Sequence, residues 1–191
     1  MNDRRRHQRI RFSAPPAIKL GSNGSSGQGR IENISLSGMM ARSSLPLEPG
    51  QVAGCEFTLG TSPAIDQSVA VVSRLGDLVG LRFQPGLANP LLLADAMADA
   101  LACGTASVLT QHEINGQRVL RISGGFNGSL REDFLHMLEH SGIAELDLSG
   151  VTSVDEAGLA LCRLAVDKHG VRLGQQATCF SRAWQLLNAG S

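Results

Sequence analysis

The pattern of apolar and polar residues changes about halfway along the chain. In the first half, apolar residues fall in short runs, as in Val69 to Arg74 and Val79 to Phe83, and Arg30 to Ser35 alternates between polar and apolar residues. A period of two is typical of strands with one buried face. Turn residues such as Leu75-Gly76-Asp77 and Pro49-Gly50 separate these runs. Short strands at this spacing predict an antiparallel β-barrel or sandwich, of which we expect the barrel.

The start of this region contains the longest polar stretch. Ala17 to Leu20 predicts a strand, and Arg30 to Ser35 alternates like a strand that ends in a turn. Between them, Gly21 to Gly29 is rich in Gly and Ser. Such a composition predicts a long flexible hairpin loop.

Helical spacing begins at Asn89-Pro90, a pair that suits a helix cap and first turn. Leu93, Met97 and Leu101 then recur at helical intervals, and Gly104 can end the helix. We expect this helix to close the barrel. The boundary therefore falls near Gly104, with domains at 1–104 and 105–191.

The second half alternates strands and helices. Asn115-Gly116 is a strong hairpin-turn signal between two strands, Ser107 to Ile114 and Val119 to Ser123. The later elements form a single series along the chain. They are a helix opened by a capping box at Ser129 to Glu132, a strand at Ile143 to Leu148, a helix at Ala157 to His169, strands at Val171 to Leu173 and Ala177 to Phe180, and a last helix capped by Ser181. This order predicts an α/β domain with a mixed sheet covered by helices.

The chain has 191 residues and a formal net charge of zero, but its charges are unevenly placed. The first eleven residues hold five arginines and one aspartate. A positive field confined to one arm favours a specific anion site over a broad nucleic-acid surface. Aromatic residues make up 4% of the chain and Tyr is absent, which is poor material for stacking single-stranded bases. We therefore expect no nucleic-acid partner.

The sequence contains few features of a membrane protein, a metalloprotein or an enzyme. No apolar run has membrane-spanning length and no signal-peptide pattern is present, so we expect a cytoplasmic protein without membrane insertion. The four cysteines are dispersed, as for reduced core thiols. His136 and His140 have the spacing of a helical metal pair, but Glu139 between them is at the wrong position for a zincin motif. We expect no metal, no cofactor and no enzymatic activity.

Two short motifs lie near the N-terminus. Arg5 and Arg9 form R-x-x-x-R, preceded by Arg4, and Asn33, Ser35 and Gly38 form N-x-S-x-x-G. Guanidinium groups bind phosphates and guanine edges bidentately. Asn and Ser supply small donors and acceptors, and Gly permits close backbone approach. The arginine run alone also fits a solvated tail or a nonspecific phosphate binder; the second motif favours a defined site.

Residues 3 to 100 resemble the PilZ family of small β-barrels that bind the second messenger cyclic di-GMP. The resemblance implies that Arg5 and Arg9 clamp the ligand from a flexible arm, and that Asn33, Ser35 and Gly38 line the barrel face opposite. It also implies that Arg4 influences whether one or two ligand molecules bind.

A further motif, Leu146 to Leu161, resembles the STAS family over residues 105 to 190. Asp155 stands at a helix start, where Asp155, Glu156 and Gly158 are candidates for binding a protein partner. Switchable members have a phosphorylated serine where this chain has Ala157, so the resemblance implies no phosphorylation there. Asp155 also fits a plain N-cap, and the leucines that follow it fit a core.

Two functions follow. The first is a cyclic di-GMP receptor or adaptor that couples ligand binding to a protein partner through its STAS-like half. The second is a nucleotide-independent regulatory subunit, in ABC-type lipid transport or a sigma-factor pathway, with a vestigial nucleotide site.

Overall fold

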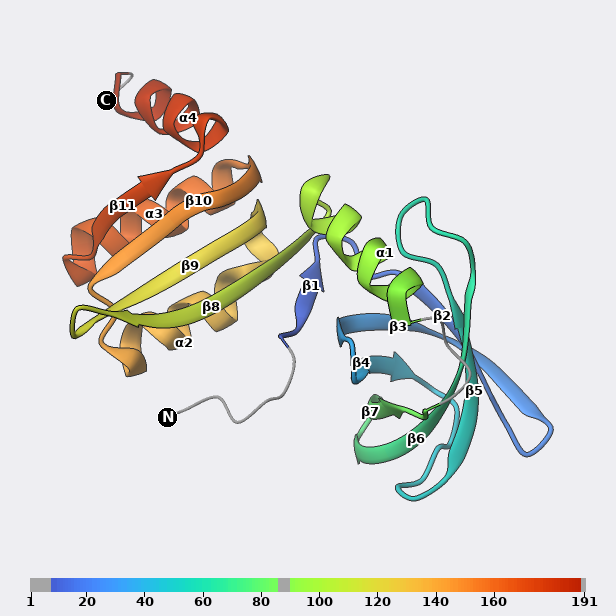
Figure 1. Cartoon of the computed structure of the whole chain (residues 1–191). Coiled ribbons are helices and arrows are strands. Elements are labelled where there is room, and N and C mark those ends of the chain that lie inside the picture. Colours follow the sequence, from blue (N-terminus) through green and yellow to red (C-terminus); the bar gives the residue numbers. More distant parts are fainter. Residues whose placement is uncertain (1–7, 86–89, 190–191) are drawn as a thin grey trace. The chain divides into compact units, whose positions relative to one another are not determined.

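The computed structural model describes residues 8–85 and 90–189. The chain divides into two compact units between Ala100 and Leu101. In Figure 1 the strands β1 to β7 belong to the N-terminal unit, and β8 to β11 belong to the C-terminal unit. The observed division lies a few residues before the boundary that the sequence predicts.

Six strands of the N-terminal unit form a closed antiparallel barrel. They pair in the order β3-β2-β5-β6-β7-β4, and β4 pairs again with β3, which closes the ring. The predicted barrel is therefore confirmed. The strands are β2 (Ala17–Ser22), β3 (Ser25–Ser35), β4 (Gly38–Ser43), β5 (Val52–Phe57), β6 (Ile65–Leu75) and β7 (Leu78–Phe83).

The alternation of apolar residues explains the barrel interior. Ile31, Ile34, Val69 and Val79 are fully buried, and strand neighbours of opposite polarity point outward. A short strand, β1 (Ile10–Phe12), pairs with β3 outside the ring, with Ile10 opposite Ile34 and Arg11 opposite Asn33. This pairing brings the N-terminal arm to the strand that carries the second motif.

The prediction of a flexible loop over Gly21 to Gly29 is wrong. There β2 and β3 pair in continuous register from Ala17 opposite Arg30 to Ser22 opposite Ser25. The turn is only Asn23-Gly24, with φ of 50° and 78°. Two positive φ values in a two-residue turn match the twist of a hairpin, so the Gly-rich segments continue as strands.

The helix α1 (Pro90–Ala102) begins at the predicted proline. Its buried residues are Leu93, Ala96, Met97 and Ala100, which share one face. Asn89, the expected cap, lies outside the described residues. Gly104 follows the helix with a φ of 72°, a conformation that ends helices.

The C-terminal unit is an α/β layer. Its strands are β8 (Ala106–Ile114), β9 (Gln117–Phe126), β10 (Glu145–Val154) and β11 (Arg172–Gln176). The β8–β9 hairpin is antiparallel, whereas β9, β10 and β11 are parallel, so the predicted mixed sheet is confirmed. The helices are α2 (Arg131–Ser141), α3 (Glu156–His169) and α4 (Thr178–Ala189).

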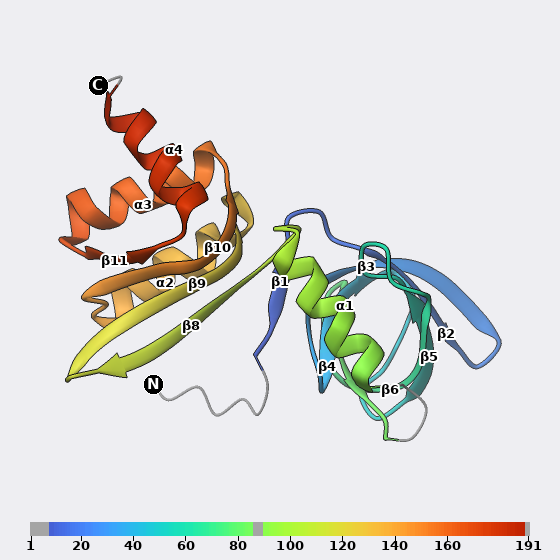
Figure 2. The ribbon, with the colours of Figure 1, turned by 45° about the horizontal axis from the view of Figure 1, so that its top comes forward.

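Three helices contribute to the core of this unit. Phe134 of α2, Cys162 of α3 and Phe180 of α4 are fully buried together with sheet residues such as Leu120 and Leu146. Figure 2 shows α2 and α3 along the same side of the sheet. No helix in the described part of the chain is long and apolar enough to cross a bilayer.

Two local predictions in this unit are wrong. The expected capping box does not form, because Leu130 is the N-cap of α2 and makes no side-chain cap bond. Asn127 instead accepts the Ser129 amide at 2.9 Å and opens a short 3₁₀ turn, Gly128–Leu130, ahead of the helix. The strand expected over Ala177 to Phe180 is the first turn of α4, which begins before Ser181.

Candidate functional site

The second motif forms the tight turn between β3 and β4. Ser35 ends β3 and lies opposite Gly38, the first residue of β4. The Ser35 hydroxyl donates to the Gly38 carbonyl oxygen at 3.1 Å and accepts the Ser37 amide at 3.3 Å. Ser35 is only 1% exposed. Its hydroxyl therefore holds the turn in shape.

Gly38 lies where no side chain fits. A Cβ at this position would overlap the carbonyl oxygen of Leu81 on β7. The Phe83 amide of β7 also donates to the Ser37 carbonyl oxygen at 3.0 Å. The turn is therefore anchored to two strands, and its backbone is fixed before any ligand arrives.

Asn33 connects the two motifs. Its side-chain Oδ1 accepts a hydrogen bond from the Arg9 guanidinium at 3.3 Å, although the residues are 24 positions apart. Both side chains are half-buried. The sequence-predicted residues Arg9 and Asn33 are thus together in the structure, and Ser35 and Gly38 follow on the same strand pair.

The described residues of the two motifs lie on the outer side of the barrel wall. Ile34, between Asn33 and Ser35, is fully buried, so its neighbours point to the other side of the sheet. Cross-strand partners share a face, and Met40 lies opposite Asn33. The candidate site is therefore a surface across β1, β3 and β4. Arg4 and Arg5, also predicted here, lie outside the described residues.

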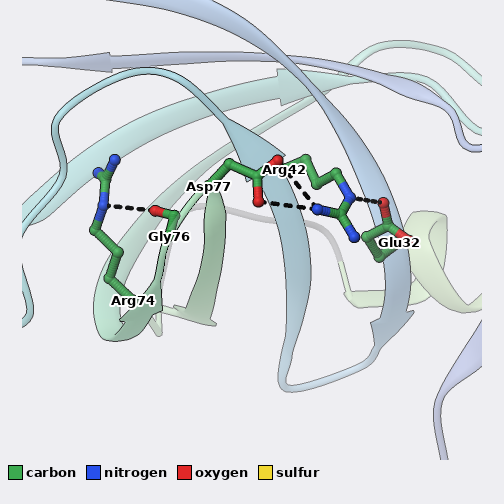
Figure 3. A network of polar contacts seen from close by, with 5 residues as sticks. All are labelled: Glu32, Arg42, Arg74, Gly76 and Asp77. Carbon is green, nitrogen blue, oxygen red and sulfur yellow. Dashed lines mark hydrogen bonds and ion pairs between the residues drawn. The ribbon is translucent and has the colours of Figure 1, made fainter.

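Another arginine of the same face is already paired. Arg42 on β4 donates from Nε to Glu32 at 2.8 Å and from Nη1 to Asp77 at 2.9 Å, as Figure 3 shows. These hydrogen bonds, first that to Asp77 and then that to Glu32, raise the pKa of the guanidinium. Its charge is balanced within the barrel. Arg74 is likewise occupied, by the carbonyl oxygens of Leu45 and Gly76.

Sequence reasoning missed two arginines beside the motif. Arg11 lies opposite Asn33, and Arg82 lies opposite Gly38. Cross-strand register is a long-range property that no local motif contains. The alternation in β7 was an available signal, because buried Val79 and Leu81 place Arg82 outward.

In the C-terminal unit, the predicted partner-binding residues lie at the start of α3. Asp155 is the N-cap, and its carboxylate accepts the Gly158 amide at 2.8 Å. Asp155 and Glu156 are exposed. Gly158 is buried, and a Cβ there would overlap the Phe126 carbonyl oxygen. Its small size therefore allows α3 to pack on β9.

The candidate metal pair on α2 consists of His136 and His140. The rings of His136 and His140 stack with centroids 4.5 Å apart, and His140 Nδ1 lies 3.0 Å from the His136 carbonyl oxygen. Within residues 8–85 and 90–189, no three His, Cys, Asp or Glu side chains are placed to hold a metal ion.

Comparison with protein families gives a match in the N-terminal region. Residues 3–92 match the family model of the PilZ domain, which supports the PilZ domain expected from the two motifs. The match covers the barrel and ends within α1, so it leaves the C-terminal unit unassigned. A search of curated proteins found no match.

Several solved structures are similar to about half of the chain. The PilZ domain with c-di-GMP of YcgR from Escherichia coli is 18% identical, covering 51% of this chain and 95% of that one, with a TM-score of 0.40. Bacillus subtilis inhibitor of motility (MotI/DgrA) is 15% identical, covering 52% of each chain, with a TM-score of 0.42. YcgR from Escherichia coli in complex with c-di-GMP is 22% identical, covering 50% of this chain and 44% of that one, with a TM-score of 0.40.

Proposed function

We propose that this chain is a receptor for cyclic di-GMP. The ligand binds on the outer face of the barrel, between the arginine arm that contains Arg4, Arg5 and Arg9 and the β3–β4 turn, where Asn33 is half-buried and the buried Ser35 and Gly38 shape the backbone. The observation that carries the proposal is the Arg9–Asn33 hydrogen bond, which joins the two motifs. The PilZ match over residues 3–92 supports the same ligand.

The chemistry of these groups suits a cyclic guanine dinucleotide. Arginine offers five donors in a planar fork that fits phosphates and the O6 and N7 atoms of guanine. In the free protein the Arg9–Asn33 contact is 3.3 Å long, which exceeds the usual range for a hydrogen bond. A charged phosphate offers Arg9 a stronger acceptor than the neutral Asn33 amide. Ligand binding therefore draws the arm onto a turn that is already rigid.

The experiment that tests the site is equilibrium binding of cyclic di-GMP to Arg9→Ala, Arg5→Ala and Asn33→Ala. Loss of a charge-assisted contact costs about 1.5–3 kcal/mol, so each arginine variant should bind at least about tenfold more weakly. Lys19→Ala, an exposed cation on β2, serves as the control and should bind like the wild type. If Arg9→Ala bound as tightly as the wild type, the assigned site would be wrong.

We further propose that the C-terminal unit is STAS-like and transmits the ligand state to a protein partner. Its element order, β8-β9-α2-β10-α3-β11-α4, and its mixed sheet support the assignment. The exposed residues Asp155 and Glu156 at the start of α3 are the proposed contact. The proposal places both activities in the cytoplasm and assigns the chain no reaction to catalyse.

Partner binding can be separated from ligand binding. Glu156→Arg keeps the Asp155 cap and should weaken partner capture, whereas Glu139→Arg on exposed α2 should leave it unchanged. Cyclic di-GMP should alter the partner's affinity by about 5- to 150-fold, the usual range of coupling free energies. Equal capture with and without ligand would favour the nucleotide-independent regulatory subunit instead.

A further inference from the structure

Arg82 lies directly across the sheet from the second motif. On β7 it pairs in register with Gly38 on β4, and Gly38 pairs in turn with Ser35 on β3. Paired residues of neighbouring strands present their side chains on the same face. The row Ser35–Gly38–Arg82 therefore runs across the outer face of the barrel, beside the row that contains Asn33 and Met40.

We infer that Arg82 is a third arginine of the ligand site, binding a phosphate or guanine edge of cyclic di-GMP from the β7 side. The inference rests on the proposed function and extends it to a strand that carries neither motif. Arg9 approaches Asn33 from the β1 side of β3. Arg82 is on β7, which pairs with β4 on the side away from β3, so the two arginines belong to strands on opposite sides of the motif.

The spacing suits one ligand held from both sides. Neighbouring strands lie about 4.8 Å apart, so the backbone of Arg82 is about 10 Å across the sheet from that of Ser35. Between them lies Gly38, which has no side chain to obstruct the surface. Cyclic di-GMP is a dianion with one phosphate on each side of its sugar–phosphate ring, so an arginine on either side of Gly38 can bind one phosphate or one guanine edge.

The Arg82 side chain is also available to bind an anion. It is exposed, and it forms no ion pair with another described residue. Arg42, on the same face, is instead neutralised by Glu32 and Asp77 (Figure 3). An unpaired guanidinium beside the motif attracts an anion without first breaking an internal contact.

The backbone under Arg82 is rigid. The next residue, Phe83, donates its amide to the Ser37 carbonyl oxygen at 3.0 Å. A Cβ on Gly38 would come within 3.0 Å of the Arg82 Cα, which shows how closely the two strands approach. Arg82 is thus held at a fixed distance from the motif turn, as a preorganised binding residue requires.

The test is titration of cyclic di-GMP into the full chain carrying Arg82→Ala, Arg82→Lys or Arg30→Ala, at low and at moderate salt. Arg30 is the matched control, because it is exposed on the outer face but lies in the row of Arg42, away from Gly38. We expect Arg82→Ala to weaken binding about tenfold or more and to reduce its salt dependence. Arg82→Lys should recover part of the affinity, since lysine keeps the charge but loses the fork.

The possible outcomes separate the two proposals. Wild-type affinity in Arg82→Ala, with Arg9→Ala impaired, would overturn the role of Arg82 and leave the proposed function standing. No binding by the wild-type chain would overturn both. Without ligand, Arg82→Ala and the wild type should unfold at the same temperature. A lower unfolding temperature for the variant would indicate that Arg82 stabilises the barrel, which contradicts a role in ligand binding alone.

Discussion

Ser35 and Gly38 stabilise the turn between β3 and β4 without any ligand. The hydroxyl of Ser35 bonds the turn internally, and Gly38 lets β4 lie against the Leu81 carbonyl oxygen. Two of the three residues in the second motif therefore shape the surface. Asn33 presents a side chain to the arginine arm.

This division of roles predicts the effect of adding a methyl group at Gly38. Gly38→Ala places a Cβ against backbone atoms, which cannot move as a side chain can, and overpacking of this kind costs about 1–3 kcal/mol. Gly54→Ala on β5 is the control, since nothing lies within 4 Å of its Cβ position. Urea unfolding should show a lower midpoint for Gly38→Ala only. Equal midpoints would mean that Gly38 is needed for ligand contact alone.

The sequence identified the residues of the motif but not all of their neighbours. Asn33, Ser35 and Gly38 stand close together in the chain, so a local motif contains them. Arg82 joins them only through the β4–β7 register. Register depends on the whole ring of strands, and this explains why the row across the barrel face became visible only in the structure.

At the scale of elements, hairpins and helix ends were the most predictable features. Asn115-Gly116 forms the expected turn, with φ of 53° and 75°. Gly142 and Gly170 end their helices with φ of 58° and 64°, because glycine adopts this conformation without a steric penalty. The Gly-rich segment before Arg30 misled the prediction, because composition indicated a loop where pairing with β2 maintains a strand.

The start of α2 offers a direct test between two caps. The sequence favours Ser129 as the cap, whereas in the structure Asn127 accepts the Ser129 amide. Asn127→Ala should therefore destabilise the C-terminal unit by about 1 kcal/mol. Ser129→Ala should cost little, because the Ser129 hydroxyl is buried with no hydrogen-bond partner among the described residues. If Ser129→Ala lowered the unfolding temperature more than Asn127→Ala, the capping box expected from the sequence would be present after all.

At the scale of the whole molecule, two separate cores hold one buried thiol each. Burial, with a smaller contribution from Asp66, raises the pKa of the Cys55 thiol in the barrel to about 12. Burial also raises the pKa of the Cys162 thiol in the C-terminal core to about 12. Cys103 and Cys179 are exposed. The reactivity of Cys55 therefore reports on unfolding of the barrel, and that of Cys162 on unfolding of the C-terminal unit.

The rate of thiol labelling at pH 8 should distinguish the exposed cysteines from the buried ones. Only the thiolate reacts, so Cys103 and Cys179 should be modified quickly by Ellman's reagent, and Cys55 and Cys162 only on unfolding. Rapid modification of all four would contradict the described cores.

A core substitution then tests whether the units unfold separately. Phe134→Ala removes a fully buried ring from the C-terminal core, at a cost of about 3–5 kcal/mol. It should speed the labelling of Cys162 and leave Cys55 protected. Equal acceleration at both thiols would show that the two units unfold together.

Calorimetric titration of cyclic di-GMP into the full chain measures directly whether the barrel binds this ligand. We expect saturable binding with micromolar or tighter affinity. We also expect much weaker binding of cyclic di-AMP, because adenine replaces the O6 acceptor of guanine with an amino donor. Absence of heat and of any thermal shift with cyclic di-GMP, in protein shown to be folded, would mean that the barrel is not a receptor for this ligand.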